Sequence, residues 1–259
     1  MLPSMPDLAA RVFGSGDDLI LLHGGVGSWT HWKRNIAALS EEYRVVAFDL
    51  PGFGDSADFD DGDPDENYFR WVADAILAKA EGPIRLVGFS FGGTVAAAVA
   101  HRLRPRLASL TLVAPGSFGK PGKRLVSVKP VRPQAGVEIH PREAARHNLG
   151  EVMFADPGVA DPHTVDLHLQ NIARARFNSR RLSWQDRLES DLGPVNCPIQ
   201  FIWGEEDRMA TPSVPARADL CQRIKPKAQV DLIPAAGHWV QYEKSDAFND
   251  VLLSFIRSI

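Results

Sequence analysis

The chain has 259 residues, of which 44% are hydrophobic and 24% are charged, and its formal net charge is -3. This composition is sufficient for one well-buried core, and its slight acidity argues against a nucleic-acid partner. The sequence contains no apolar run long enough to span a bilayer and no leader-like start, which predicts a cytoplasmic protein with no membrane partner. The oligomeric state stays open.

The first strong strand signal, residues 19–22, leads directly into the glycine-rich loop HGGVGSW at 23–29. Glycines let backbone N–H groups turn inward, so we expect the amide of Val26, and also that of Gly25, to stabilise an oxyanion. His23 is predicted to brace the loop by hydrogen bonding. Trp29 is a possible wall of a substrate pocket.

The segment GFSFG at 88–92 follows another apolar run and precedes a row of small residues. A serine hydroxyl is a weak nucleophile unless a base can reach it at a tight, exposed turn. The two glycines permit such a turn between a strand and a helix, so Ser90 is the predicted nucleophile. The amide of Phe91 is predicted to be the second oxyanion donor, and Phe89 is a possible pocket residue.

An acid and a base follow later strands. The apolar run 199–203 ends in GEED, where Asp207 is the predicted acid and Glu205 and Glu206 are the local alternatives. The run 229–233 is followed by a turn that carries His238, the predicted general base. The chain order serine, aspartate, histidine is the one expected when all three lie at strand ends of such a sheet.

Apolar strands alternate with helical segments from 19 to 113, which predicts an α/β protein with a mostly parallel sheet covered by helices on both faces. The strand signal then stops until 199. Helices are expected at 141–150, at 161–177 and around Trp184. We therefore predict a core of residues 1–115 and 194–259, with 116–193 inserted as a helical cap over the carboxyl end of the sheet.

The predicted cap holds 12 Lys and Arg against 9 Asp and Glu, so an anionic substrate is permitted. Arg174 and Arg176 lie on a predicted cap helix, where they could contact substrate or form surface salt bridges. Cys197 and Cys221 lack the spacing of a metal or redox motif, and the histidines lack that of a zinc helix, so neither a metal nor a cofactor is predicted.

Taken in chain order, the motifs HGG, DxxGxGxS, GxSxGG, WGxxD and GHW closely resemble those of the α/β-hydrolase family, over nearly the whole chain. The resemblance implies an α/β-hydrolase fold and a serine hydrolase. The turn that carries His238 resembles that of the meta-cleavage-product hydrolases, which commonly have a tryptophan after the histidine, as this chain has Trp239. Those enzymes cleave a carbon–carbon bond in dienoic keto acids. Trp239 is therefore a further pocket candidate. This chain departs from them at two places. They often carry asparagine at the position of Phe89, and their oxyanion loop often reads HGxGPG, whereas this chain has HGGVGS.

Because Phe89 cannot supply a polar contact, hydrolysis of a small-molecule carboxylic ester or lactone through an acyl-enzyme on Ser90 is the first prediction. Carbon–carbon bond hydrolysis of a dienoic keto acid is the alternative. A ligand receptor with little turnover is a further alternative, since fold and triad do not by themselves establish turnover.

Overall fold

The computed structural model describes residues 7–60, 62–122, 126–132 and 138–259. The start of the predicted core and two parts of the predicted cap, residues 123–125 and 133–137, lie outside the described residues. Within the described part of the chain, none of the helices has the length and apolar character needed to cross a membrane.

Seven strands form one sheet in the order β1-β3-β2-β4-β5-β6-β7. All neighbouring strands pair in parallel except β1, which runs antiparallel to β3 at one edge, so the predicted mostly parallel sheet is confirmed. The sequence did not predict β1, because this half-exposed edge strand has no apolar run. The strands are β1 Ala10–Phe13, β2 Asp18–Leu22, β3 Arg44–Phe48, β4 Ile84–Phe89, β5 Leu107–Val113, β6 Ile199–Gly204 and β7 Gln229–Ile233.

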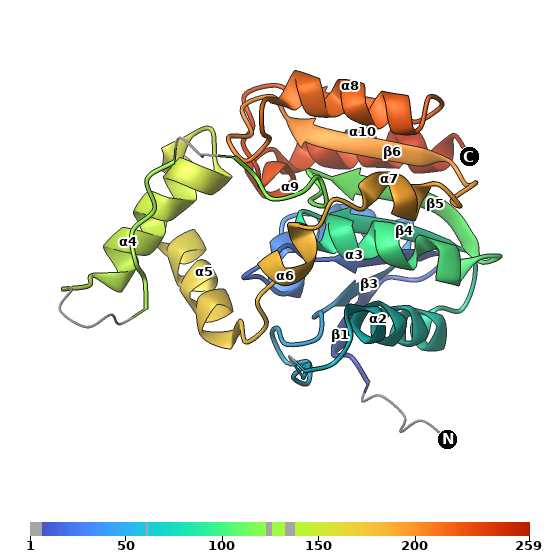
Figure 1. Cartoon of the computed structure of the whole chain (residues 1–259), viewed down its shortest axis with the longest axis horizontal. Helices are drawn as coiled ribbons and strands as arrows, with labels where there is room; N and C mark the ends of the chain where they lie inside the picture. Colours follow the sequence, from blue (N-terminus) through green and yellow to red (C-terminus); the bar gives the residue numbers. More distant parts are fainter. Residues whose placement is uncertain (1–6, 61, 123–125, 133–137) are drawn as a thin grey trace.

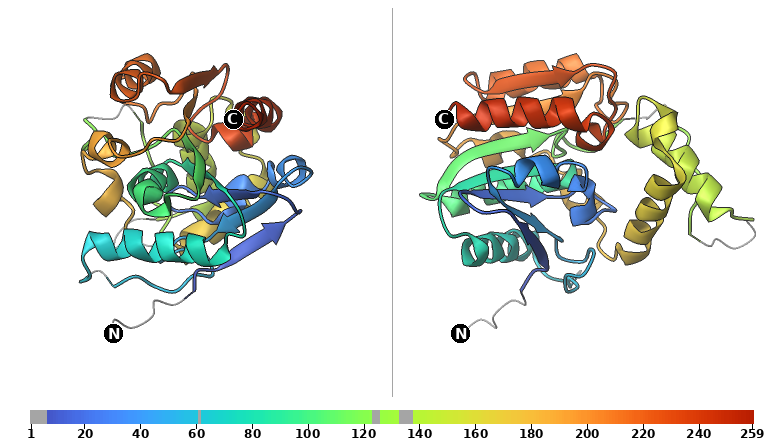
Figure 2. Two further views of the ribbon diagram at one scale, coloured as in Figure 1. Left: turned by 90° about the vertical axis from the view of Figure 1, so that its right-hand side faces the viewer. Right: turned by 180° about the vertical axis from the view of Figure 1, so that it is seen from behind.

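Helices cover both faces of the sheet, as predicted. In the end-on view, α2, α3, α7 and α8 lie on one face, and α1 and α10 lie on the other (Figure 2). The central strands β2 and β3 are consequently apolar after their first residues, Asp18 and Arg44, since neither face of the sheet meets water there. The helices of the core are η1 Trp29–Trp32, α1 Ile36–Leu39, α2 Asp65–Lys79, α3 Phe91–Ala100, η2 His101–Leu103, α8 Val214–Ile224, α9 Val240–Glu243 and α10 Ser245–Arg257.

Between β5 and β6, the described residues before Pro141 form no helix, and the helices expected at 141–150, at 161–177 and around Trp184 are present as α4, α5 and α6. The start of α5 follows the predicted chemistry, because the Asp161 carboxylate accepts the Thr164 N–H at 2.7 Å. The elements are α4 Pro141–Asn148, η3 Leu149–Met153, η4 Pro157–Val159, α5 Pro162–Arg174, α6 Arg180–Ser183 and α7 Leu188–Leu192.

These helices do not all lie in one place. Figure 1 shows α4 and α5 beyond the carboxyl ends of the strands, whereas α7 returns to the core and packs beside α3. The carboxyl ends of parallel strands are where α/β sheets bind ligands. The insertion therefore brings α4 and α5 to the end of the sheet that carries the predicted site residues.

Candidate active site

Ser90 lies at a strained turn between β4 and α3. Its φ is +51° and its ψ is -110°, a backbone conformation that a residue with a side chain rarely adopts. The flanking glycines are required sterically: a Cβ on Gly88 would lie 2.3 Å from the Gly92 carbonyl oxygen, and a Cβ on Gly92 would lie 2.3 Å from the Leu22 carbonyl oxygen. Close packing of β2, β4 and α3 thus holds the Ser90 hydroxyl at the end of the sheet.

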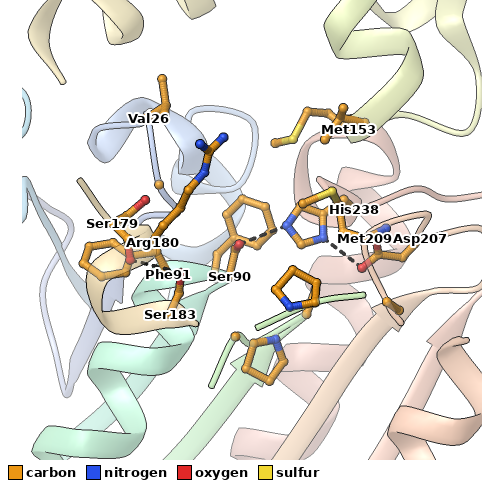
Figure 3. A pocket seen from close by; sticks show the side chains of 18 of the residues that line it. Val26, Ser90, Phe91, Met153, Ser179, Arg180, Ser183, Asp207, Met209 and His238 are labelled. Carbon is orange, nitrogen blue, oxygen red and sulfur yellow. Dashed lines mark hydrogen bonds and ion pairs between the residues drawn. The ribbon is translucent and has the colours of Figure 1, made fainter. Parts of the chain in front are cut away.

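The structure brings Ser90, His238 and Asp207 into one hydrogen-bonded chain (Figure 3). The Ser90 Oγ and the His238 Nε2 are 2.9 Å apart, and the His238 Nδ1 lies 2.8 Å from the Asp207 Oδ2. Because an ionised carboxylate can only accept, Nδ1 donates its proton, which leaves Nε2 free to accept the proton of the serine. Asp207 also accepts the Met209 N–H at 2.7 Å.

The two alternative acids are excluded by position, since Glu205 and Glu206 are both exposed and the buried carboxylate is that of Asp207. A different acid holds the histidine loop. Glu243 accepts the Gly237 N–H at 2.7 Å, and its carboxylate also accepts the amides of Ala155 and Asp156. One side chain therefore ties the residue before His238 to the insertion.

The glycine-rich loop is braced by His23, as predicted. Its Nδ1 donates to the Gly24 carbonyl at 2.7 Å, and its Nε2 accepts the Leu50 N–H at 2.9 Å. Burial lowers the pKa of His23, which keeps the imidazole neutral. Both nitrogens are used by backbone groups, so this histidine holds the loop in place.

Gly25, Val26 and Phe91 all line the cavity beside Ser90. Val26 has φ +54°, and Phe91 begins α3, whose first amides have no acceptor within the helix. Both features suit backbone donors directed at a reacting oxygen. The oxyanion role of these residues stays a prediction.

Ser90 opens into a cavity of about 620 Å³ whose wall includes residues of the core and of the insertion. Phe89 lines it, with its ring centroid 5.1 Å from that of His238. Trp29 does not line it, and the prediction for this residue is wrong. Its ring packs against Phe13, and its backbone N–H, at the start of η1, donates to the Asp49 carboxylate at 2.7 Å.

Trp239 is likewise absent from the cavity wall. It is fully buried, its ring stacks on Tyr242 and Phe154 at centroid distances of 4.1 and 5.6 Å, and its Nε1 donates to the His31 carbonyl. The predicted pocket role is therefore wrong. Trp239 instead fixes the turn that presents His238 to Ser90.

Arg174 and Arg176 do not reach the cavity either, and they form the salt bridges that were their alternative. Arg174 pairs with Asp55 at 2.7 Å, and Arg176 pairs with Asp58. Both acids lie on the loop after β3, which extends toward the carboxyl end of α5. These contacts attach the insertion to the core.

The cavity wall also includes basic and imidazole side chains that were not among the predicted pocket residues, namely those of Lys129, His168, Arg180 and Arg217. Figure 3 shows the Arg180 side chain extending from α6, with Met209 on the opposite side of Ser90. Its guanidinium lies 5.4 Å from the ring centroid of Trp184 and has no ion pair among the described residues. The adjacent Arg181 pairs with Asp65 instead, at 2.6 Å. Because α6 is a single turn, the sequence has no helical periodicity there that would predict which of the two arginines faces the cavity.

Comparison with known proteins agrees with this geometry. The model of the alpha/beta hydrolase family matches residues 19–251, and the chain belongs to this family. It is 31% identical over 255 residues to the dihydrolipoyllysine-residue acetyltransferase component of the acetoin cleaving system of Pseudomonas putida, covering 93% of this chain and 64% of that protein. The chain thus spans less than two thirds of that relative.

A second relative is nearer in length. The 2-hydroxy-6-oxononadienedioate/2-hydroxy-6-oxononatrienedioate hydrolase of Comamonas testosteroni is 29% identical over 269 residues, covering 94% of this chain and 88% of that protein. Among solved structures, a meta-cleavage product hydrolase superposes with a TM-score of 0.76 at 23% identity, over 97% of this chain and 95% of that one. At that identity the superposition shows the shared fold alone.

Proposed function

We propose that the protein is a serine hydrolase that cleaves a small-molecule carboxylic ester or lactone through an acyl-enzyme on Ser90. The observation that carries the proposal is the continuous hydrogen-bonded chain from Asp207 through His238 to Ser90 at the floor of a cavity. A serine with an imidazole nitrogen at 2.9 Å, and a carboxylate hydrogen-bonded to the other nitrogen of that ring, is the arrangement that nucleophilic acyl transfer requires.

In the proposed reaction, the His238 Nε2 takes the Ser90 proton while Oγ attacks the substrate carbonyl. The negative charge on the carbonyl oxygen is stabilised by the amides of Val26 and Phe91, with that of Gly25 as the further candidate. Collapse of the tetrahedral intermediate expels the alcohol, which receives the proton from His238. Water, deprotonated by the same imidazole, then attacks the acyl-enzyme and releases the acid.

We further propose that the substrate is anionic. Arg180 lies at the cavity without an ion pair among the described residues, and Lys129 and Arg217 also line the wall. Arg217 lies over the Phe118 ring at 3.9 Å, and burial lowers the pKa of its guanidinium. Neither guanidinium forms a salt bridge among the described residues, and a partly desolvated cation favours an anionic ligand that supplies the missing carboxylate.

Carbon–carbon bond hydrolysis of a dienoic keto acid is the second candidate. It is favoured by the relative from Comamonas testosteroni, whose name gives it a dienedioate substrate, and by the basic cavity. The apolar Phe89 beside the nucleophile favours ester or lactone hydrolysis, because its ring offers no hydrogen bond to a keto or enol oxygen.

Steady-state turnover on matched substrates tests these alternatives. The panel contains a neutral 4-nitrophenyl ester, the 4-nitrophenyl monoester of a dicarboxylic acid, a lactone and a ring-fission dienoic keto acid. We expect turnover that Ser90→Ala abolishes, and a preference for the anionic ester. Strong preference for the keto acid would favour the second candidate, and binding without turnover would favour a ligand receptor.

A matched pair of variants tests the anionic substrate. Arg180→Met should lower kcat/KM for the dicarboxylic monoester by about ten-fold or more, the expected effect of losing one charged hydrogen bond, and affect the neutral ester less. Arg174→Met, which breaks an exposed ion pair outside the cavity, is the control. Equal loss on both esters in Arg180→Met would contradict recognition of the anion.

A further inference from the structure

His168 lines the same cavity and has no part in the proposed chemistry. Three other histidines near the site use their nitrogens on protein groups. Both nitrogens of His23 and of His238 are hydrogen-bonded, and the Nδ1 of His31 accepts the Gly24 N–H at 3.2 Å. His168 differs from all of them, because neither of its nitrogens has a hydrogen-bond partner among the described residues.

The position of His168 is fixed by its helix. Thr164, His168 and Asn171 lie at positions i, i+4 and i+7 of α5 and so share one face. The two outer residues anchor that face to the core: the Thr164 hydroxyl is 3.0 Å from the Tyr242 hydroxyl, and the Asn171 Oδ1 accepts the Ser28 hydroxyl at 2.8 Å. His168, between these anchors, is therefore held over the cavity with little freedom to turn away.

The two nitrogens of the His168 ring differ in their surroundings. Nδ1 is closed off from solvent and has no partner in the described part of the chain, so Nε2 is the nitrogen left accessible at the cavity wall. A buried N–H without an acceptor is rarer and costlier than an unpaired acceptor, which places the single proton of the neutral ring on Nε2. Burial lowers the pKa of His168 to about 4, so the ring stays neutral at neutral pH.

We propose that His168 is a substrate-binding residue whose Nε2–H donates a hydrogen bond to a second oxygen of the substrate, separate from the scissile carbonyl. The ligand class that fits is an acyl compound with a keto or hydroxyl oxygen along its chain, whose anionic end Arg180 would bind. A histidine kept only for packing would leave an accessible polar nitrogen idle at the wall of a binding cavity. The inference rests on the proposed function in taking this cavity as the substrate site.

The test measures binding, so that it does not depend on turnover. Calorimetry gives Kd for a series of short oxoalkanoates, with the ketone at successive positions, and for the matching plain alkanoates. The parent protein should bind at least one oxoalkanoate more tightly than its plain counterpart. His168→Leu should reduce that preference by about two- to ten-fold, the worth of one hydrogen bond, and His168→Gln, which keeps a donor, should retain part of it.

His163→Leu is the control, because His163 lies on the same helix, is exposed and contacts Lys33 outside the cavity. It should leave the preference unchanged. Absence of any preference in the parent, or the same preference in His168→Leu, would overturn the inference. If the esters are cleaved while His168→Leu keeps the preference, the inference fails and the proposed function stands. If the parent protein shows the preference, His168→Leu loses it, and no ester is cleaved, then the inference about His168 stands and the proposed ester hydrolysis fails.

Discussion

Asp207→Asn should disable the proposed base, His238, by moving its ring proton from Nδ1 to Nε2. One carboxylate oxygen of Asp207 accepts the Met209 N–H and the other accepts the His238 Nδ1–H. The backbone N–H can only donate, so the amide oxygen of asparagine must face Met209 and its NH2 group must face His238. Nδ1 then has to accept, the ring proton moves to Nε2, and Nε2 can no longer take the proton of Ser90.

The magnitude follows from the cost of the opposite orientation. Turning the amide would restore the tautomer but leave the Met209 N–H facing the NH2 group, at about 1–3 kcal/mol for a buried unsatisfied donor. That alone lowers the active fraction by about five- to 150-fold. Loss of the charge that stabilises the imidazolium adds to it, so we expect kcat to fall by about 10³- to 10⁴-fold, or roughly 4–5.5 kcal/mol.

The assay is hydrolysis of a 4-nitrophenyl ester by parent, Asp207→Asn and Glu206→Gln, with thermal unfolding of each protein as a check on folding. Glu206 is the neighbouring exposed acid, and its variant should retain parent activity. Asp207→Asn should unfold near the parent temperature, since the side chains have the same shape. A loss smaller than ten-fold in a folded Asp207→Asn protein would refute the reasoning.

Three further outcomes are expected. Gly92→Ala should destabilise the fold by about 3 kcal/mol or more, because its Cβ would lie 2.3 Å from a carbonyl oxygen of β2. Gly82→Ala, which has open space around it, is the control, and both variants are measured by urea unfolding. Equal stabilities of the two variants would contradict the steric argument. Glu243→Gln should lower stability by roughly 1.5–3 kcal/mol and reduce kcat, because one amide oxygen cannot serve amides on both sides of a carboxylate, and an unchanged melting temperature would count against this role. The pKa of His168 is 6.5 in the unfolded chain and about 4 in the folded protein, so the unfolded chain binds more protons between these two pH values. The free energy of unfolding should therefore decrease on acidification from pH 6.5 to pH 4, by roughly 3 kcal/mol from this group. His168→Leu should make the free energy of unfolding less dependent on pH in this range.

The insertion illustrates where prediction from sequence ended. Arg174, Arg176 and Arg180 are alike in charge and lie within seven positions, yet only the last lines the cavity. The difference arises because Asp55 and Asp58, more than a hundred residues earlier, lie within reach of the first two. No local pattern contains that information. Trp239 is a similar case, since its neighbour His238 faces Ser90 while its own ring is buried among aromatic side chains.

The sequence by itself determined the parts of the site that depend on local structure. A glycine-flanked turn after an apolar strand, and an acid and a histidine after two later strands, specify Ser90, Asp207 and His238, because parallel strands bring their carboxyl ends to one edge of the sheet. Tertiary structure alone decided which side chains of the insertion reach the cavity. That outcome depends on how α5 and α6 dock onto the core, through contacts between residues that are distant in the chain.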